Sequence, residues 1–265
     1  MPTVPELIAA AGERPITTLT AYDAPTAEIV DEAGVDIILV GDSMGNTVLG
    51  YETTLPVSME EMHHHTAAVA RGTEEALVVA DLPFLSVGVS RAETVRNAGE
   101  LVKEAGADAV KLESGPHTVE VTEHLVDLGI PVMAHLGLTP QRINQLGGHA
   151  RQGTTRDAAR EMLDLARAHE DAGAFSLVLE HVPANVAAQI TEALSTPTIG
   201  IGAGPDTDGQ VLVITDVLGL TEWSPSFARQ FGDVRDEMER AVADYRDAVE
   251  DGEFPAEEHT HRDAS

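Results

Sequence analysis

Short apolar runs alternate along this chain with longer stretches in which apolar residues recur at helical spacing. The runs are rich in Val, Ile and Leu, and eight of them occur, at 15–22, 36–43, 76–83, 109–114, 131–137, 175–183, 197–204 and 210–219. Segments such as AETVRNAGELVKEAG and RDAAREMLDLARAHEDAG lie between most of them. Periodicity of these two kinds predicts strands that alternate with amphipathic helices.

A weak internal repeat supports this alternation. DEAGVDIILV, KEAGADAVKL and EDAGAFSLVL each predict a helix that ends at Ala-Gly and a strand that begins within three residues. Glycine after the last helical turn is the usual left-handed cap, and a short connection then leads into the next strand. The repeated unit is therefore one strand with one helix.

Eight such units match the size of a closed barrel of about 250 residues. A doubly wound open sheet usually has fewer strands and carries a glycine fingerprint after the first one. We therefore predict an α/β fold, a single-domain (β/α)8 TIM barrel with terminal helices over residues 1–250, and a C-terminal tail over 251–265. The longest predicted helix, 226–252, is long enough to wrap the barrel or reach a neighbouring subunit.

Ionisable side chains follow the apolar part of five of the eight predicted strands. In order along the chain they are Asp42 with Ser43, Asp81, Lys111 with Glu113, His135, and Glu180. Strand ends of one barrel meet at its C-terminal rim, which carries the active site in enzymes of this fold. Side chains two apart on a strand share a face, so Lys111 and Glu113 both point into the mouth.

Three of these acids, Asp42, Asp81 and Glu113, fall on neighbouring strands. A single acid at a strand end is more often a turn or helix cap, but four on separate strand ends favour a functional site. The three carboxylates would repel one another unless protons or a cation neutralised them. Oxygen ligands without cysteine favour Mg²⁺ over Zn²⁺.

Two other polar patterns give weaker signals. His63, His64 and His65 are consecutive, and neighbours on a helix diverge by about 100°, so they are predicted as surface and packing residues with His65 inward. The glycine-rich stretch 200–204 is compatible with a phosphate cradle or with a tight turn.

The composition of the chain limits the kinds of molecule that it is expected to bind. The chain has 45 acidic and 16 basic residues, a formal charge of -29, and only two lysines, Lys103 and Lys111. The electrostatic field of such a negatively charged protein repels nucleic acid and anionic membranes. Acids scattered along predicted helices favour a surface adapted to concentrated salt, the alternative being an ordinary acidic protein. No cysteine, no signal segment and no apolar run near ~20 residues occur, which predicts a soluble cytoplasmic protein.

Several longer motifs are similar to those of one family. They are TAYDAPTA, LVGDSMGNTVLGYETTLPV, ADLPF, VKLE, AHLGLTPQ, LVLEHVP and PTIGIGAGPDTDGQVLV, and the likeness extends to GEFPAEEH near the C-terminus. In order and spacing they resemble the ketopantoate hydroxymethyltransferase family. The resemblance implies a Mg²⁺-dependent (β/α)8 barrel that forms homo-oligomers, typically decamers, and makes ketopantoate for pantothenate and coenzyme A biosynthesis.

The resemblance also implies roles for the rim residues. Glu180 is the implied catalytic base. The implied metal ligands, which bind directly or through water, are Asp42, Asp81 and Glu113. The implied keto-acid site comprises Asp42, Ser43, Asp81, Lys111 and His135. The expected reaction removes a proton from C3 of 3-methyl-2-oxobutanoate, and a Mg²⁺-stabilised enolate then attacks a one-carbon unit from 5,10-methylenetetrahydrofolate.

Two segments depart from the family pattern. GGHARQG has His149 and Ala150 where the family commonly has an aromatic residue and a lysine, and TEWSPSF replaces a segment that more often reads HIPKF. Both segments are candidates to contact the one-carbon donor. The sequence is therefore compatible with either folate or a modified pterin as the donor.

Three other functions compete with this interpretation. A lyase of the isocitrate lyase or phosphoenolpyruvate mutase type would share the metal and keto-acid site, but those enzymes generally use a cysteine-bearing loop. A Schiff-base aldolase would use Lys111 as its nucleophile, although three neighbouring acids favour the protonated amine. A catalytically silent barrel is the third, and the complete set of rim residues argues against it.

Overall fold

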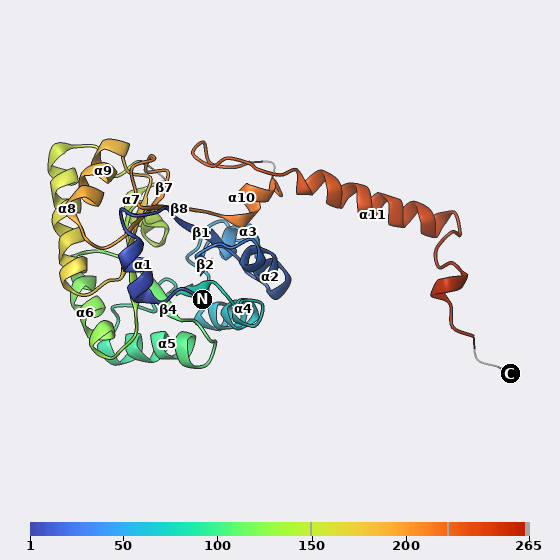
Figure 1. Cartoon of the computed structure of the whole chain (residues 1–265), viewed down its shortest axis with the longest axis horizontal. Coiled ribbons are helices and arrows are strands. Elements are labelled where there is room, and N and C mark those ends of the chain that lie inside the picture. The colour runs from blue at the N-terminus through green and yellow to red at the C-terminus, as the bar shows by residue number, and fades with distance from the viewer. Residues whose placement is uncertain (149, 222, 263–265) are drawn as a thin grey trace. The chain divides into compact units, whose positions relative to one another are not determined.

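The computed structural model describes residues 1–148, 150–221 and 223–262. These form two compact units, 1–213 and 214–265. The first unit contains a closed barrel of eight parallel strands with helices outside it (Figure 1). The predicted (β/α)8 barrel is confirmed, whereas the division into 1–250 and a tail over 251–265 stays a prediction.

All eight strands lie close to their predicted positions. They are β1 (Ile16–Thr20), β2 (Ile37–Val40), β3 (Leu77–Asp81), β4 (Ala109–Glu113), β5 (Val132–Gly137), β6 (Ser176–Glu180), β7 (Thr198–Ile201) and β8 (Gly209–Leu212). Each pairs in parallel with the next, and β1 pairs with β8, which closes the barrel.

Helices precede the first strand and connect the strands of the first unit. They are α1 (Val4–Ala10), α2 (Ala24–Glu32), α3 (Met44–Thr47), α4 (Met59–Arg71), α5 (Arg91–Lys103), α6 (Val119–Asp127), α7 (Ile143–Leu146), α8 (Arg156–Asp171) and α9 (Ala184–Ala193), with 3-10 turns η1 (Pro116–Thr118) and η2 (Pro140–Arg142). The predicted repeat is confirmed, because α2, α5 and α8 are each followed by a glycine at positive φ, Gly34, Gly106 and Gly173.

Two predicted boundaries were wrong. The eighth strand was expected to run to residue 219, but β8 ends at Leu212 and α10 (Ile214–Leu218) follows. A short apolar run bounded by glycine does not distinguish a buried strand from a helical turn. The long helix expected over 226–252 is α11 (Val234–Glu250), because Gly232 precedes it and Asp233 occupies the N-cap position.

The barrel interior is apolar at the end where the strands begin. One cluster of buried side chains joins the inward positions of the strands, including Ile37, Leu77 and Val178. Leu7 and Ala10 of α1 belong to the same cluster, so α1 covers this end of the barrel. A second cluster packs the outer side of β5 and β6 against α8 and α9. The two clusters place one apolar layer on each side of the strands.

Aspartates at the same end of the barrel tie neighbouring strands together. Each lies just before a strand and accepts a hydrogen bond from a backbone N–H of the preceding strand. The three pairs are Asp36 with Thr17 (2.8 Å), Asp108 with Val78 (2.9 Å) and Asp208 with Thr198 (2.8 Å). These carboxylates satisfy backbone donors at the strand starts, where the sheet ladder does not reach them.

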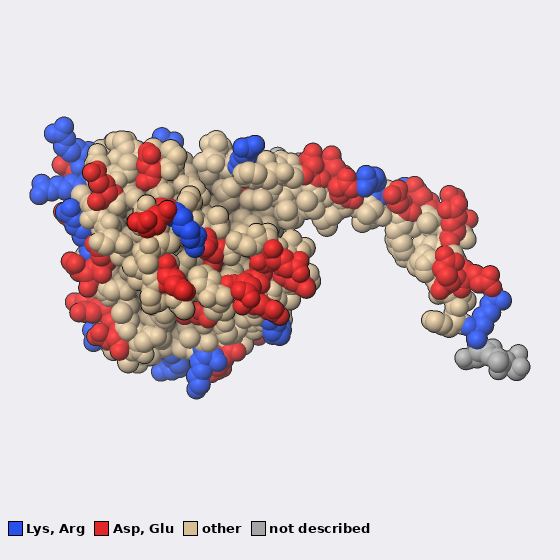
Figure 2. Space-filling model, in the orientation of Figure 1, with Lys and Arg blue, Asp and Glu red and all other residues tan. Residues whose placement is uncertain are grey.

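The second unit contains α10, α11 and the 3-10 turn η3 (Glu257–His259). On α11, Met238, Val242, Tyr245 and Val249 form an exposed apolar row. Across the visible face of the molecule, Asp and Glu are scattered and not gathered in one patch (Figure 2). Among the described helices, none is long and apolar enough to cross a membrane.

One buried histidine in the first unit links stability to pH. His169 of α8 is fully buried, and its Nδ1 lies 3.0 Å from Thr122 Oγ1 of α6. Burial lowers the pKa of His169 to about 4, only partly opposed by the nearby backbone of Gly115. An unfolded chain binds a proton at this position near pH 6.5, and the folded chain does not.

We therefore expect His169 to reduce the free energy of unfolding as pH falls from about 6.5 to about 4. This group alone should lower the free energy of unfolding by roughly 2 kcal/mol between about pH 7 and about pH 5. His169→Gln removes the titration, so its unfolding free energy should fall less steeply over that range. Guanidinium unfolding at a series of pH values in concentrated KCl measures both slopes. Parallel slopes for the two proteins would contradict the prediction.

Candidate functional site

The inward positions of the barrel change from apolar to ionisable as the strands reach their C-terminal ends. Val79 is followed two residues later by Asp81, Ala109 by Lys111 and Glu113, Met133 by His135, and Val178 by Glu180. Parallel pairing places Asp81 beside Lys111, and Glu113 beside His135. Strand alternation therefore brings these five side chains to one mouth, as the sequence predicts.

Asp42 and Ser43 lie just beyond β2. The backbone N–H of Asp42 donates to Asp81 Oδ2 at 3.0 Å, which holds the two acids next to each other. Ser43 stands at the start of α3, and its Oγ lies 2.8 Å from the hydroxyl of Tyr22, which follows β1. Residues from the first three strands are thus joined at the rim.

A buried ion pair forms the centre of the site. Lys111 Nζ lies 2.9 Å from Asp81 Oδ1, and both side chains are buried. Burial lowers the pKa of Lys111, but the charges of Asp81 and Asp42 outweigh it, so the pKa is raised overall. The ammonium is therefore charged at neutral pH.

His135 connects this ammonium to Glu180. His135 Nδ1 lies 3.3 Å from Lys111 Nζ, and its Nε2 lies 3.0 Å from Glu180 Oε2. Burial, and then the positive charge of Lys111, lower the pKa of His135. A neutral imidazole beside an ammonium must accept at Nδ1, so its proton is on Nε2, the nitrogen that lies next to the Glu180 carboxylate.

The acids nearest the ion pair carry more negative charge than Lys111 neutralises. Burial, and then repulsion by Asp81, raise the pKa of Asp42 to about 7. Burial and the charge of Asp42 likewise raise the pKa of Glu113 well above its usual value. A site of this kind takes up protons or a cation.

Gln141 ends the AHLGLTPQ motif, but it was not among the predicted site residues. Its side-chain Nε2 donates to Asp42 Oδ2 at 2.8 Å and to the carbonyl oxygen of Leu82 at 3.1 Å. Its backbone N–H donates to the carboxylate of Glu113 at 2.9 Å. Gln141 therefore joins two of the rim acids from the loop after β5, and its place at the end of a long motif was the available signal.

Tyr22 was also missed, and it follows β1 in the TAYDAPTA motif. Its hydroxyl meets Ser43, and its backbone carbonyl accepts a hydrogen bond of 2.6 Å from Nδ1 of His65 on α4. The inward direction predicted for His65 is therefore confirmed, while His64 is exposed.

The backbone around Glu180 is sterically constrained. Gly137 is paired with Glu180 and has φ 98°, and a Cβ there would collide with the carbonyl oxygen of Glu180. His181, the next residue, has φ 50°, a conformation that L-residues seldom adopt. Both features fix the direction in which the chain leaves β6.

Of the two divergent segments, GGHARQG follows α7 and TEWSPSF belongs to the second unit. His149 and Glu222 lie outside the described residues. Gln152, which follows Ala150 and Arg151, donates its backbone N–H to the carbonyl of His181 at 3.1 Å, so this loop runs close to Glu180. In the 200–204 stretch, a Cβ on Gly204 would collide with Ala184, which favours a tight turn over a cradle.

The carboxylates at the mouth are the candidate donors for a metal ion. Within the ranges that the structure describes, no three His, Asp or Glu side chains converge as a ready-made metal site. Mg²⁺ in proteins is usually held by one or two carboxylates and keeps several waters. Asp42 and Asp81 are adjacent and buried, and the carboxylates around them outnumber the one ammonium. This donor set fits a hard divalent cation, and the three-ligand set with Glu113 stays a prediction.

Comparison with known proteins gives a consistent result. The sequence model described as ketopantoate hydroxymethyltransferase matches residues 2–257. A 3-methyl-2-oxobutanoate hydroxymethyltransferase from Halobacterium salinarum is 70% identical over 247 residues, 93% of this chain and 90% of its own. Enzymes of the same name from Haloarcula marismortui and Pyrobaculum aerophilum are 66% and 55% identical, over 98% and 94% of this chain and 97% and 94% of their own.

Solved structures with low sequence identity share the fold. A phosphonopyruvate hydrolase complex with oxalate and Mg²⁺ has a TM-score of 0.63 at 14% identity and covers 98% of this chain and 93% of its own. A 2,3-dimethylmalate lyase of the PEP mutase/isocitrate lyase superfamily has a TM-score of 0.59 at 18% identity, over 100% and 92%. At this identity the likeness concerns the barrel alone.

The series of contacts from Lys111 through His135 to Glu180 predicts the protonation state of His135. We expect a neutral ring with its proton on Nε2 at about pH 6.5, where an ordinary histidine is half charged. Two-dimensional ¹⁵N–¹H spectra of histidine-labelled protein distinguish the tautomers, and His135→Gln identifies the resonance by its loss. In Lys111→Met the pKa of His135 should rise, because the positive neighbour is removed while Glu180 remains. A doubly protonated ring in the unsubstituted protein would contradict this arrangement.

Proposed function

The chain belongs to the ketopantoate hydroxymethyltransferase family, and from this premise we propose how its barrel mouth transfers a hydroxymethyl group to 3-methyl-2-oxobutanoate to form ketopantoate. The observation that carries the proposal is the continuous series of contacts from Asp81 through Lys111 and His135 to Glu180. It places a fixed positive charge and an oriented carboxylate in the same mouth.

The reaction balances with 5,10-methylenetetrahydrofolate as the proposed one-carbon donor. C3 of the keto acid loses its proton and forms a bond to the methylene carbon of the donor. Both bonds from that carbon to the folate nitrogens break, and one water supplies the hydroxyl oxygen. The C3 proton and one proton of the water balance the two N–H groups of tetrahydrofolate. A modified pterin would satisfy the same balance.

Lys111 suits the binding of an anionic keto acid. Within the described part of the chain, it is the one buried residue among the lysines and arginines. A buried ammonium attracts a carboxylate or a developing enolate oxygen far more strongly than an exposed one does, because water screens it less. Ser43, whose hydroxyl is held by Tyr22, is a second proposed contact to the substrate.

Glu180 is the proposed base that removes the C3 proton. Its side chain is 17% exposed, against 4% for His135 and 7% for Lys111, so it is the member of the series most open to a ligand. His135 Nε2 lies 3.0 Å from one carboxylate oxygen, Oε2, and leaves the other to face the substrate. His135 is therefore proposed as a positioning residue for Glu180 as well as part of the keto-acid site.

The proposed metal ligands are Asp42 and Asp81, with Glu113 in the same acid cluster. A bound Mg²⁺ would withdraw electron density from the substrate ketone and make the C3 hydrogen more acidic. The chain's own contribution is to hold these carboxylates in place, through Gln141 on Asp42 and Glu113 and through Lys111 on Asp81.

Family membership at this identity disfavours the lyase and the silent barrel as alternatives. The raised pKa of Lys111 argues against a Schiff-base mechanism, because such a nucleophile must be an uncharged amine. Borohydride with the keto acid should therefore leave the mass of the protein unchanged. We further propose that the enzyme works in the cytoplasm as a homo-oligomer, a decamer by family resemblance.

Hydrogen exchange at C3 tests the proposed base without the donor. In ²H₂O with Mg²⁺ and concentrated KCl, the unsubstituted protein should exchange the C3 hydrogen of 3-methyl-2-oxobutanoate, measured by proton NMR. Glu180→Gln should slow this exchange by about 100-fold or more, because a positioned general base contributes about that factor. Chelation of Mg²⁺ by EDTA should also stop it.

Glu192→Gln is the matched control, because it makes the same chemical change on the exposed side of α9. It should exchange at the rate of the unsubstituted protein. Normal exchange in Glu180→Gln would remove Glu180 from the mechanism even if the overall activity survived.

A further inference from the structure

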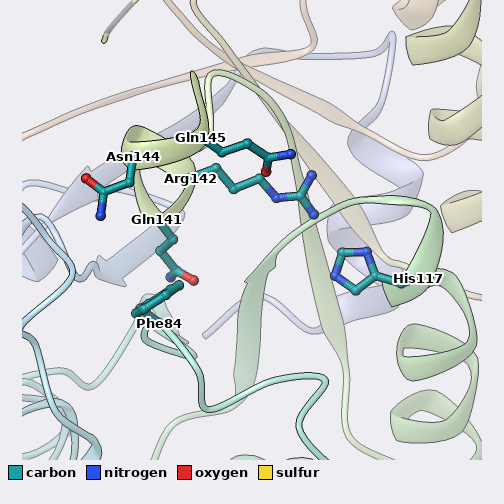
Figure 3. A pocket seen from close by; sticks show the side chains of 6 residues that line it. All are labelled: Phe84, His117, Gln141, Arg142, Asn144 and Gln145. Atoms are coloured by element: carbon teal, nitrogen blue, oxygen red, sulfur yellow. The ribbon is translucent and has the colours of Figure 1, made fainter. Parts of the chain in front are cut away.

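A cavity lies beside the barrel mouth. It has a volume of about 480 Å³, within the range of pockets that hold cofactor-sized molecules. Its lining residues come from the loops after β3, β4 and β5 (Figure 3), and they are Phe84, His117, Gln141, Arg142, Asn144 and Gln145. None of the contacts described above assigns a function to this cavity.

Gln141 is a wall shared by this cavity and the candidate active site. Its side chain donates to Asp42 and to the carbonyl of Leu82, and its backbone N–H donates to Glu113. Phe84 lies two residues after Leu82 and faces the Gln141 side chain (Figure 3). A ligand in the cavity would therefore adjoin the site where the keto acid is proposed to react.

The chemistry of the lining is unusual for this protein. The chain has a formal charge of -29, yet the cavity is lined by Arg142 and His117 and by no Asp or Glu. Three other described cavities each include at least one carboxylate in their lining. This cavity is therefore suited to an anionic group.

The remaining lining suits a flat heterocycle. Phe84 is 40% exposed in a chain with only 3% aromatic residues, so its ring is available for stacking. The amides of Asn144 and Gln145 supply both donors and acceptors for the edge of a ring. Stacking with edge recognition is how proteins commonly bind planar nitrogen heterocycles.

The absence of a side chain at Gly115 leaves the space in which the Arg142 guanidinium packs. A Cβ at Gly115 would collide with the Arg142 guanidinium and come within 3.1 Å of His117 Cε1. The backbone of Gly115 is extended, with φ -160°, so another residue fits its conformation but not the space. The guanidinium therefore packs against the main chain in a position that depends on the missing side chain.

We propose that this cavity binds the one-carbon donor, a reduced pterin with an anionic tail, with its ring against Phe84 and its tail at Arg142 and His117. The proposal rests on the hydroxymethyl transfer proposed above. The keto acid itself occupies the mouth at Lys111 and does not use the cavity. The shared Gln141 wall then brings the donor's methylene carbon next to the substrate.

The experiment compares Arg142→Gln and Phe84→Ala in the full-length enzyme with Mg²⁺. With methylenetetrahydrofolate, each variant should raise the KM for the donor by about 10-fold or more, since a charge-assisted hydrogen bond or a stacked ring contributes about that factor. The KM for the keto acid and the donor-free C3 exchange should keep their values. Arg167→Gln, the same substitution on an exposed part of α8, is the control.

A donor without the acidic tail separates the role of Arg142, which binds the tail, from that of Phe84, which stacks on the ring. With the 5,10-methylene derivative of 6-(anilinomethyl)tetrahydropterin, which keeps N5 and N10 but lacks the acidic tail, Arg142→Gln should match the unsubstituted enzyme, whereas Phe84→Ala should still raise the donor KM. Gly115→Ala, which displaces the guanidinium without removing it, should reproduce the effect of Arg142→Gln on the folate donor.

Three results would overturn the proposal. They are an unchanged donor KM in both Arg142→Gln and Phe84→Ala, an equal effect of Arg142→Gln on the tailed and tail-less donors, and slowed C3 exchange in Arg142→Gln, which would place Arg142 at the keto acid. Absence of C3 exchange in the unsubstituted enzyme would instead count against the function proposed for the mouth.

Discussion

The contact between Lys111 and Asp81 determines most of what the barrel mouth can do. Moving an ammonium out of water costs several kcal/mol unless a partner compensates for it, and Asp81 lies 2.9 Å away inside the barrel. Because the pair keeps Lys111 charged, His135 must turn its unprotonated Nδ1 toward the ammonium. Its Nε2–H is then directed at Glu180. One ion pair thereby fixes a tautomer and the orientation of a carboxylate two strands away.

The barrel separates stability from chemistry along its axis. At the end where the strands begin, the interior is filled with aliphatic side chains, and Asp36, Asp108 and Asp208 tie neighbouring strands by backbone hydrogen bonds. At the other end, the same inward positions carry charges that oppose one another. The first arrangement supplies the rigidity that holds the second in place, which is the usual division of labour in this fold.

Strand positions and most of the rim could be read from the sequence, because alternation assigns a face to each residue once a strand is located. The contacts of Gln141 and Tyr22 could not, since they depend on how loops after β5 and β1 return over the mouth. The end of β8 and the start of α11 were misplaced for a related reason. Short apolar runs near glycine are compatible with more than one element, and only tertiary packing decides between them.

The burial of the ionic groups also has an evolutionary consequence. In molar salt the Debye length is about 3 Å, so charges exposed on the surface hardly sense one another, whereas buried pairs are screened much less. Lys111, Asp81 and His135 are buried, so bulk ions screen the interactions among them much less. The outer residues of the barrel are therefore free to diverge with the salinity of the habitat, while the electrostatics that govern the reaction stay insulated from that change.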